Sequence, residues 1–173
     1  MLERIIIAGA GGQGIILLGK LIARIAALKT PYVTFFPAYG VEVRGGSAHC
    51  EVIFSSREIA SPCAEQTDTL ILMNQHGAQE MVNRLTPDGL ALVNSSLCHV
   101  TVRPGQTMIS LPATAMADQV GSPRSANLVM LGALLRHKPW FTAAEAEQII
   151  GDWFSGPAMD VNLRALQAGQ AHA

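Results

Sequence analysis

The segment Gly9-Ala10-Gly11-Gly12-Gln13-Gly14 constrains the fold of this chain more than any other. It follows the apolar run Arg4–Ala8 directly and comes immediately before the apolar run Ile15–Leu18. Glycines at positions 9, 11 and 14 have the spacing of a loop that joins a strand to a helix and binds phosphate groups. Backbone N–H groups in such a loop form an anion site at the start of the helix. The spacing therefore predicts a strand, a loop and a helix at the start of an α/β domain.

The acidic residue that a nicotinamide site requires is missing. In a Rossmann-type site an acid about 20 residues after the glycines, at the end of the second strand, holds the ribose hydroxyls. Here the second apolar run, Tyr32–Phe36, ends in Pro37-Ala38-Tyr39-Gly40, and the first acid beyond it is Glu42. The loop is therefore either an anion cradle, in which the Gln13 amide reaches the ligand, or a tight turn without a ligand. We expect no useful affinity for NAD.

A second unusual segment, 37–47, follows that run at the carboxyl end of its strand, where open α/β sheets bind ligands. Arg44 is followed by two glycines, so a bidentate cation stands beside accessible backbone donors. Glu42 either flanks a site together with Arg44 or neutralises it in a surface loop. The candidate binding residues of the two segments are Gly9, Gly11, Gly12, Gln13, Gly14, Tyr39, Glu42, Arg44, Gly45 and Gly46.

Six apolar runs have the length of strands, and most of them are continuous rather than alternating. They are Arg4–Ala8, Tyr32–Phe36, Ala48–Ser55, Thr69–Met73, Leu90–Val93 and Met108–Leu111. Continuous runs are typical of strands buried on both faces, so we predict a three-layer α/β/α fold with a mostly parallel, mixed sheet. The run Ala48–Ser55 alternates, with His49, Glu51 and Ile53 on one side. It predicts an edge or antiparallel strand with one wetter face.

Helices are predicted in the gaps. Gly14–Leu28 is apolar apart from a narrow stripe with Lys20 and Arg24. Thr142 begins a helix as a capping box with Glu145, and its inner face is formed by Ala146, Ile149, Ile150 and Trp153. Pro157 suits the first position of a last helix.

The stretch Asn127–Leu135 has no polar residue after Asn127, which predicts a helix buried on all sides. It is either a central core helix or a helix covered on one side by another subunit. Charged residues make up only 14% of the chain, against about 25% in an ordinary soluble domain. This low share favours a surface that a partner chain covers in part.

Composition excludes several classes of protein. A net charge of −1 and 5% aromatic residues argue against nucleic acid and anionic membrane surfaces. No apolar stretch is long enough to span a membrane, and we expect neither a signal peptide nor a location outside the cytoplasm. Cys50, Cys63 and Cys98 are too few for a four-cysteine cluster and are not spaced as a pair.

We find no catalytic or metal-ligating pattern in the sequence. His49 has no nucleophile nearby and is interpreted as a structural or interface residue. The other histidines lack metal-ligand spacing. The segment Asn94-Ser95-Ser96 ends a strand, where it either binds a ligand or caps a turn.

Taken together, the two glycine segments are similar to the γ subunit of 2-oxoacid:ferredoxin oxidoreductases. The similarity extends through Ile59-Ala60-Ser61-Pro62, Gly89-Leu90 with Asn94-Ser95-Ser96-Leu97, Ala126-Asn127 with Val129-Met130-Leu131-Gly132, and Asn162 with Ala165-Leu166. It spans essentially the whole chain, so we expect residues 1–173 to form a single γ-type domain. The stretch at 94–97 most resembles the members that act on 2-oxoglutarate and branched-chain 2-oxoacids.

The resemblance implies a multisubunit complex that decarboxylates a 2-oxoacid and releases an acyl-CoA. Thiamine diphosphate, Mg²⁺ and iron–sulfur clusters are then expected on the α, β and δ subunits, with ferredoxin as the electron acceptor. This chain would serve assembly and help shape the site that holds CoA, without activity of its own. The alternatives are a stand-alone nucleotide-binding redox enzyme and a free scaffold domain.

Overall fold

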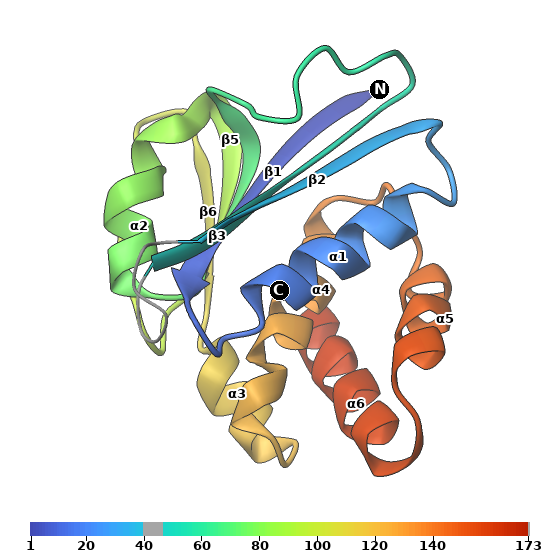
Figure 1. Cartoon of the computed structure of the whole chain (residues 1–173). Coiled ribbons are helices and arrows are strands. Elements are labelled where there is room, and N and C mark those ends of the chain that lie inside the picture. The colour runs from blue at the N-terminus through green and yellow to red at the C-terminus, as the bar shows by residue number, and fades with distance from the viewer. Residues whose placement is uncertain (40–46, 173) are drawn as a thin grey trace.

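A computed structural model describes residues 1–39 and 47–172, which form a six-stranded sheet between two layers of helices (Figure 1). From one edge to the other the strands are β2 (Tyr32–Tyr39), β3 (Ser47–Ser55), β1 (Leu2–Ala10), β4 (Thr67–Leu72), β5 (Leu85–Asn94) and β6 (Thr107–Leu111). The helices are α1 (Ile15–Ala26), α2 (Gln75–Met81), α3 (Ala113–Gln119), α4 (Ala126–His137), α5 (Ala143–Trp153) and α6 (Gly156–His172), with short 3₁₀ turns η1 (Val82–Arg84) and η2 (Pro123–Ser125).

The sheet is mixed, and the predicted three-layer α/β/α fold is confirmed. β1, β4, β5 and β6 are parallel, whereas β3 runs antiparallel to both β1 and β2. The antiparallel strand predicted at 48–55 is therefore present, but it is not at an edge, because β2 pairs with it on the outside. Of the three residues on the face predicted to be wetter, His49 is half-buried, but Glu51 and Ile53 are only 4% exposed, so that prediction is wrong for most of the strand.

Two hydrophobic cores lie on the two faces of the sheet. The larger core packs α1 and α4, with α3, α5 and α6, against residues such as Ile5, Ile7 and Leu92. The smaller core packs α2 and the segment 98–102 against the alternate residues, including Ile6. The alternation of inward side chains along β1 thus supplies both cores.

Every residue of α4 from Ala126 to Leu135 is buried, as the apolar run predicts. The chain itself provides the cover, since α4 packs against α6, α3, α1 and the sheet. The hypothesis that another subunit covers this helix is therefore wrong. Two glycines make the close contact with α6 possible: a Cβ atom at Gly132 would overlap the carbonyl oxygen of Leu166, and one at Gly169 would overlap that of Val129.

The remaining helix predictions hold with two corrections. α1 begins and ends within the predicted range, and Lys20 and Arg24 are exposed on it. The capping box of Thr142 and Glu145 is confirmed, with both of its hydrogen bonds present. Trp153 does not join the inner face of α5, because it is the last residue of the helix and is 37% exposed. α6 begins at Gly156, one residue before Pro157.

A buried carboxylate stands at the amino end of the sheet. Glu3 is 6% exposed and accepts hydrogen bonds from Thr69 Oγ1 at 2.7 Å and from Lys138 Nζ at 3.2 Å. Burial raises the pKa of Glu3 above its ordinary value of 4.5, although both hydrogen bonds oppose this shift. The folded protein therefore holds the Glu3 proton more tightly than the unfolded chain does.

This shift predicts how stability changes with pH. The contribution of the raised pKa is complete below about pH 4.5 and is lost as the pH rises through the folded value. Glu3→Gln keeps an acceptor for Thr69 and does not titrate. We therefore expect its melting temperature, relative to wild type, to rise as the pH increases above about 4.5 and to level off once the pH has passed the raised pKa of Glu3.

Glu145→Gln provides the matched control of opposite sign. The Thr142 N–H and Lys29 lower the pKa of Glu145, so its contribution is present above pH 4.5 and is lost as the pH falls through the lowered value. Its melting temperature relative to wild type should fall as the pH rises from the lowered pKa of Glu145 to about 4.5, and should stay level above that pH. Parallel curves for wild type and Glu3→Gln would contradict the prediction.

Candidate functional site

The carboxyl ends of four parallel strands meet at one end of the sheet. The loops after β1, β4 and β5 and the start of α3 after β6 lie there (Figure 1). The register places Tyr39 opposite Ala48, and Ala10 opposite Ser47, so β2 ends and β3 begins at the same end. This is the end at which open α/β sheets bind ligands. Residues 40–46 lie outside the described residues, so the roles of Glu42, Arg44, Gly45 and Gly46 stay predictions.

The glycine loop after β1 has the backbone that its sequence predicts. Gly12 and Gly14 have φ angles of 92° and 71°, a left-handed region that favours glycine. Gly14 precedes the first residue of α1 and supplies no side-chain cap. Among the described residues no side chain caps the first N–H groups of α1, so they are available to water or an anion.

Gln13 holds this loop in place. Its Oε1 accepts a hydrogen bond from the Ala10 N–H at 2.7 Å, and its Nε2 donates one to the Met73 carbonyl at 3.1 Å. A Cβ atom at Gly9 would lie 2.6 Å from Gln13 Oε1, so glycine is required beside this amide. Gln13 therefore fixes the loop to the end of β4, and its role as a ligand stays a prediction.

Two buried asparagines connect the loops at this end. Asn94, fully buried, donates from Nδ2 to Thr114 Oγ1 at 2.9 Å and accepts at Oδ1 from the N–H groups of Thr114 and Ser96. Of the two roles left open for 94–96, these contacts support the structural one. Asn127 donates to the Gly14 carbonyl at 3.3 Å. This contact could not be predicted from local sequence patterns, because the two residues are 113 positions apart.

A pocket of about 170 Å³ opens beside the glycine loop. It is lined by Gly12, Gln13, Met73, Leu97, Thr114, Pro123, Arg124 and Ala126. Arg124, on η2, is exposed and also lines a larger pocket of about 510 Å³ between α1, α4 and α6. Sequence reasoning missed Arg124, since a single arginine between Pro123 and Ser125 has no motif around it. The pocket combines backbone donors with a guanidinium group, which suits an anion.

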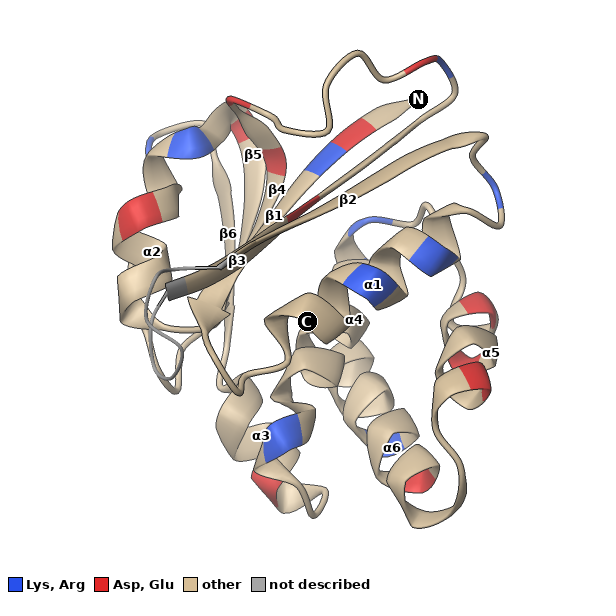
Figure 2. Ribbon diagram, in the orientation of Figure 1, with Lys and Arg blue, Asp and Glu red and all other residues tan. Residues whose placement is uncertain are grey.

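Charges are unevenly distributed over the chain. Figure 2 shows Lys and Arg on α1 and Asp and Glu on α5, whereas the loop after β1 carries none. Within residues 1–39 and 47–172, no group of three or more His, Cys, Asp and Glu side chains is arranged to hold a metal ion. Over the same residues, no helix is both long and apolar enough to cross a membrane.

The thiols of Cys50 and Cys98 and the imidazole of His49 are uncharged at neutral pH. Burial raises the pKa of the Cys50 thiol to about 12 and that of the Cys98 thiol to about 11, so neither is a thiolate at neutral pH. Burial also lowers the pKa of His49, which keeps the imidazole neutral at pH 7. The shifts of Cys50 and Cys98 are those of core residues rather than of nucleophiles.

The comparisons with known proteins agree with this architecture. The family model described as pyruvate ferredoxin/flavodoxin oxidoreductase matches residues 4–171. The 2-oxoglutarate synthase subunit KorC of Methanocaldococcus jannaschii is 32% identical over 98% of this chain and 92% of its own length. The γ subunit of a keto/oxoacid ferredoxin oxidoreductase from Geobacter sulfurreducens superposes with a TM-score of 0.84 and 28% identity, over 98% of this chain and 94% of that one.

A longer relative contains this fold as one part. The ketoisovalerate oxidoreductase subunit VorA of Methanothermobacter marburgensis is 32% identical over 96% of this chain. The chain spans only 35% of that protein's length.

Proposed function

Because this chain belongs to the pyruvate ferredoxin/flavodoxin oxidoreductase family, we propose that it is the γ-type subunit of a 2-oxoacid:ferredoxin oxidoreductase. The observation that carries the proposal is the match to KorC, which extends over 98% of this chain and 92% of that subunit. The substrate class is a 2-oxoacid such as 2-oxoglutarate or a branched-chain 2-oxoacid, in keeping with the names of KorC and VorA.

In this proposal the catalytic cofactors belong to the partner subunits. The α, β and δ subunits hold thiamine diphosphate, Mg²⁺ and the iron–sulfur clusters, and ferredoxin receives the electrons. The described part of this chain offers a poor donor set for a cluster, since two of its three cysteines are buried. Its task is to assemble the complex and to shape the site in which the acyl group reaches CoA.

We assign the carboxyl end of the sheet to the phosphate groups of CoA. Three features suit a phosphate by their chemistry: the N–H groups at the start of α1, which no described side chain caps, the left-handed glycines, and the exposed Arg124. The predicted residues Tyr39, Glu42, Arg44, Gly45 and Gly46 extend this proposal to the segment that follows β2. Arg44→Ala in the complex tests that extension: a raised KM for CoA with intact assembly supports ligand binding, and loss of assembly supports docking.

Reconstitution tests the proposed function. The chain alone, given a 2-oxoacid, thiamine diphosphate, CoA and a viologen dye, should show no turnover. The complex with its partner subunits should reduce the dye, and a complex lacking this chain should be impaired. Turnover by the chain alone at the rate of the complex would overturn the proposal, and so would a fully active complex without it.

A calorimetric titration addresses the alternative of a stand-alone nucleotide-binding enzyme. The glycine loop favours that alternative, but the position of the ribose-binding acid after Phe36 is taken by Pro37. We expect no heat of binding with NAD(H) or NADP(H). A dissociation constant in the low micromolar range, about −8 kcal/mol, would favour the stand-alone enzyme.

A further inference from the structure

A buried asparagine has one unused end in the pocket between α1, α4 and α6. Asn162, on α6, is 8% exposed and lines this pocket of about 510 Å³. Its Oδ1 accepts a hydrogen bond from Ser125 Oγ at 2.9 Å, whereas its Nδ2 donates to no described residue. A buried amide without its full set of hydrogen bonds is costly, and a ligand in the pocket would supply the missing acceptor.

A guanidinium group lines the same pocket. Arg124 immediately precedes Ser125 on η2, so the hydrogen bond between Ser125 and Asn162 brings the turn that carries Arg124 against α6. Arg124 is exposed and forms no hydrogen bond or ion pair with a described residue. None of the described residues that line the pocket is Asp or Glu. The polar part of the pocket therefore offers an amide donor and a charged donor, which suits a negatively charged acceptor group.

The remaining walls of the pocket are largely apolar. They come from α1, α4, the residue after α5 and the start of α6, and their apolar members are Leu17, Leu128, Phe154, Pro157, Ala158 and Val161. Pockets of about 300–1,000 Å³ with apolar walls and a few polar groups are typical binding sites for small molecules. A small anion without an apolar part would leave these walls in water. An apolar molecule without an anionic group would leave Arg124 and the Asn162 amide without an acceptor.

We propose that this pocket binds a small amphipathic carboxylate. Arg124 and the Asn162 amide hold the carboxylate group, and the hydrocarbon chain lies against Phe154 and Val161. The site goes beyond the proposed function, because it requires neither CoA nor a partner subunit. Two sources supply this chemistry, a fatty acid of medium length and a 2-oxoacid with an apolar side chain.

An NMR titration of the isotope-labelled full chain tests the site, because the side-chain amide signal of Asn162 reports directly on a ligand at Nδ2. Hexanoate represents the fatty acid and the 2-oxoacid of leucine represents the other source, whereas hexanol and acetate each lack one half of the chemistry. We expect at least one of the two amphipathic carboxylates to shift the Asn162 signal with a dissociation constant of about 1 mM or below. The one that binds more tightly identifies the source. Hexanol and acetate should bind at least about tenfold more weakly.

Two substitutions test the location of the site at residues that line this pocket and not the one beside the glycine loop. Ala158→Trp fills the pocket from an exposed position in the first turn of α6. Asn162→Asp keeps an acceptor for Ser125 but replaces the Nδ2 donor by an oxygen atom. Each should weaken binding at least about tenfold. Ala144→Trp is the matched control, since it enlarges an exposed alanine in the first turn of α5, and it should change the affinity less than about twofold.

A second pair of variants tests the charged group. Arg124→Met should weaken binding at least about tenfold, whereas Arg57→Met, which removes an exposed arginine near the start of β1, should not. Binding of neither carboxylate, or unchanged affinity of a folded Ala158→Trp variant, overturns the site and leaves the proposed function intact, because assembly of the complex does not enter the titration. If the Asn162 signal shifts only when a partner subunit is added, the pocket is a contact between subunits and the carboxylate site is overturned.

Discussion

Replacing Gly169 by alanine is expected to lower the free energy of unfolding by about 3 kcal/mol, the upper part of the range for overpacking a core. The added Cβ would overlap the carbonyl oxygen of Val129, and its next contacts are also backbone atoms of α4. A side chain can rotate away from such a clash, but a helix backbone cannot. Gly132→Ala should have a similar effect, because its Cβ would meet the backbone of α6 at Leu166 and Gln170. Urea denaturation measures both changes.

Gly151→Ala is the matched control for this prediction. Gly151 also lies near the carboxyl end of its helix, α5, but it is exposed, and a Cβ there would meet only Met159 Cε at 3.4 Å. Alanine should therefore stabilise the protein by about 0.5–1 kcal/mol through helix propensity. If Gly169→Ala unfolded at the same urea concentration as wild type, the close contact of α4 with α6 would be wrong.

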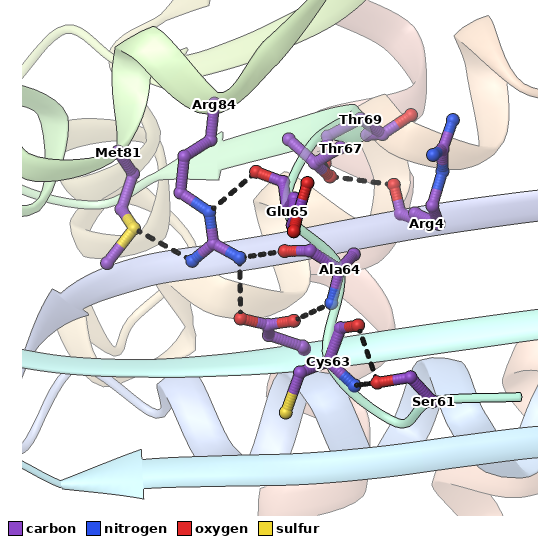
Figure 3. A network of polar contacts seen from close by, with 10 residues as sticks. Arg4, Ser61, Cys63, Ala64, Glu65, Thr67, Thr69, Met81 and Arg84 are labelled. Carbon is purple, nitrogen blue, oxygen red and sulfur yellow. Dashed lines mark hydrogen bonds and ion pairs between the residues drawn. The ribbon is translucent and has the colours of Figure 1, made fainter.

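Replacing Arg84 by methionine is expected to cost about 3 kcal/mol, because it leaves a buried carboxylate without its cation. Arg84 donates to Glu51 Oε1 at 2.9 Å and to the carbonyl groups of Ala64 and Glu65 (Figure 3). Glu51 also accepts from the Ala64 N–H at 2.7 Å. The pair therefore holds the segment 57–66 on the sheet. Loss of Arg84 should make this segment open to proteolysis, which limited trypsin digestion detects.

Two further variants distinguish the effect of losing the ion pair between Arg84 and Glu51 from a general effect of removing an arginine. Arg103→Met removes an exposed guanidinium group whose hydrogen bonds, among the described residues, go only to Asn83, and it should change stability by less than about 0.5 kcal/mol. The double variant Arg84→Met/Glu51→Leu removes the stranded charge and should recover much of the loss. A double variant no more stable than Arg84→Met would contradict the account based on the buried charge.

The parts of the fold that were predicted well from the sequence are those that depend on local patterns of residues. The glycine loop and the Thr142 capping box involve residues within a few positions of one another, so their spacing alone reveals them. The position of β2 at the edge of the sheet depends on its pairing with β3. A continuous run of apolar residues predicts a strand but does not show which strand it pairs with. The contacts of Glu51 with Arg84 and of Asn127 with Gly14 join residues 33 and 113 positions apart, and no local signal marks them.

The candidate site was predicted in outline only. Its place at the carboxyl end of the sheet follows from the strand–loop–helix pattern, which the structure reproduces. Arg124 enters the pocket through η2, a short turn between α3 and α4 that has no periodicity to detect. Gln13 belongs to the motif and was therefore predicted to bind a ligand, but its amide group is hydrogen-bonded to Ala10 and Met73.

The reciprocal glycine contacts of α4 and α6 also bear on the order of events during synthesis. A ribosome makes α4 well before α6, which begins at Gly156. Until α6 has left the exit tunnel, the face of α4 around Gly132 has no cover, although the sheet strands beneath α4 are already complete. During synthesis the nascent chain therefore exposes an apolar helix surface until the last helix arrives to cover it.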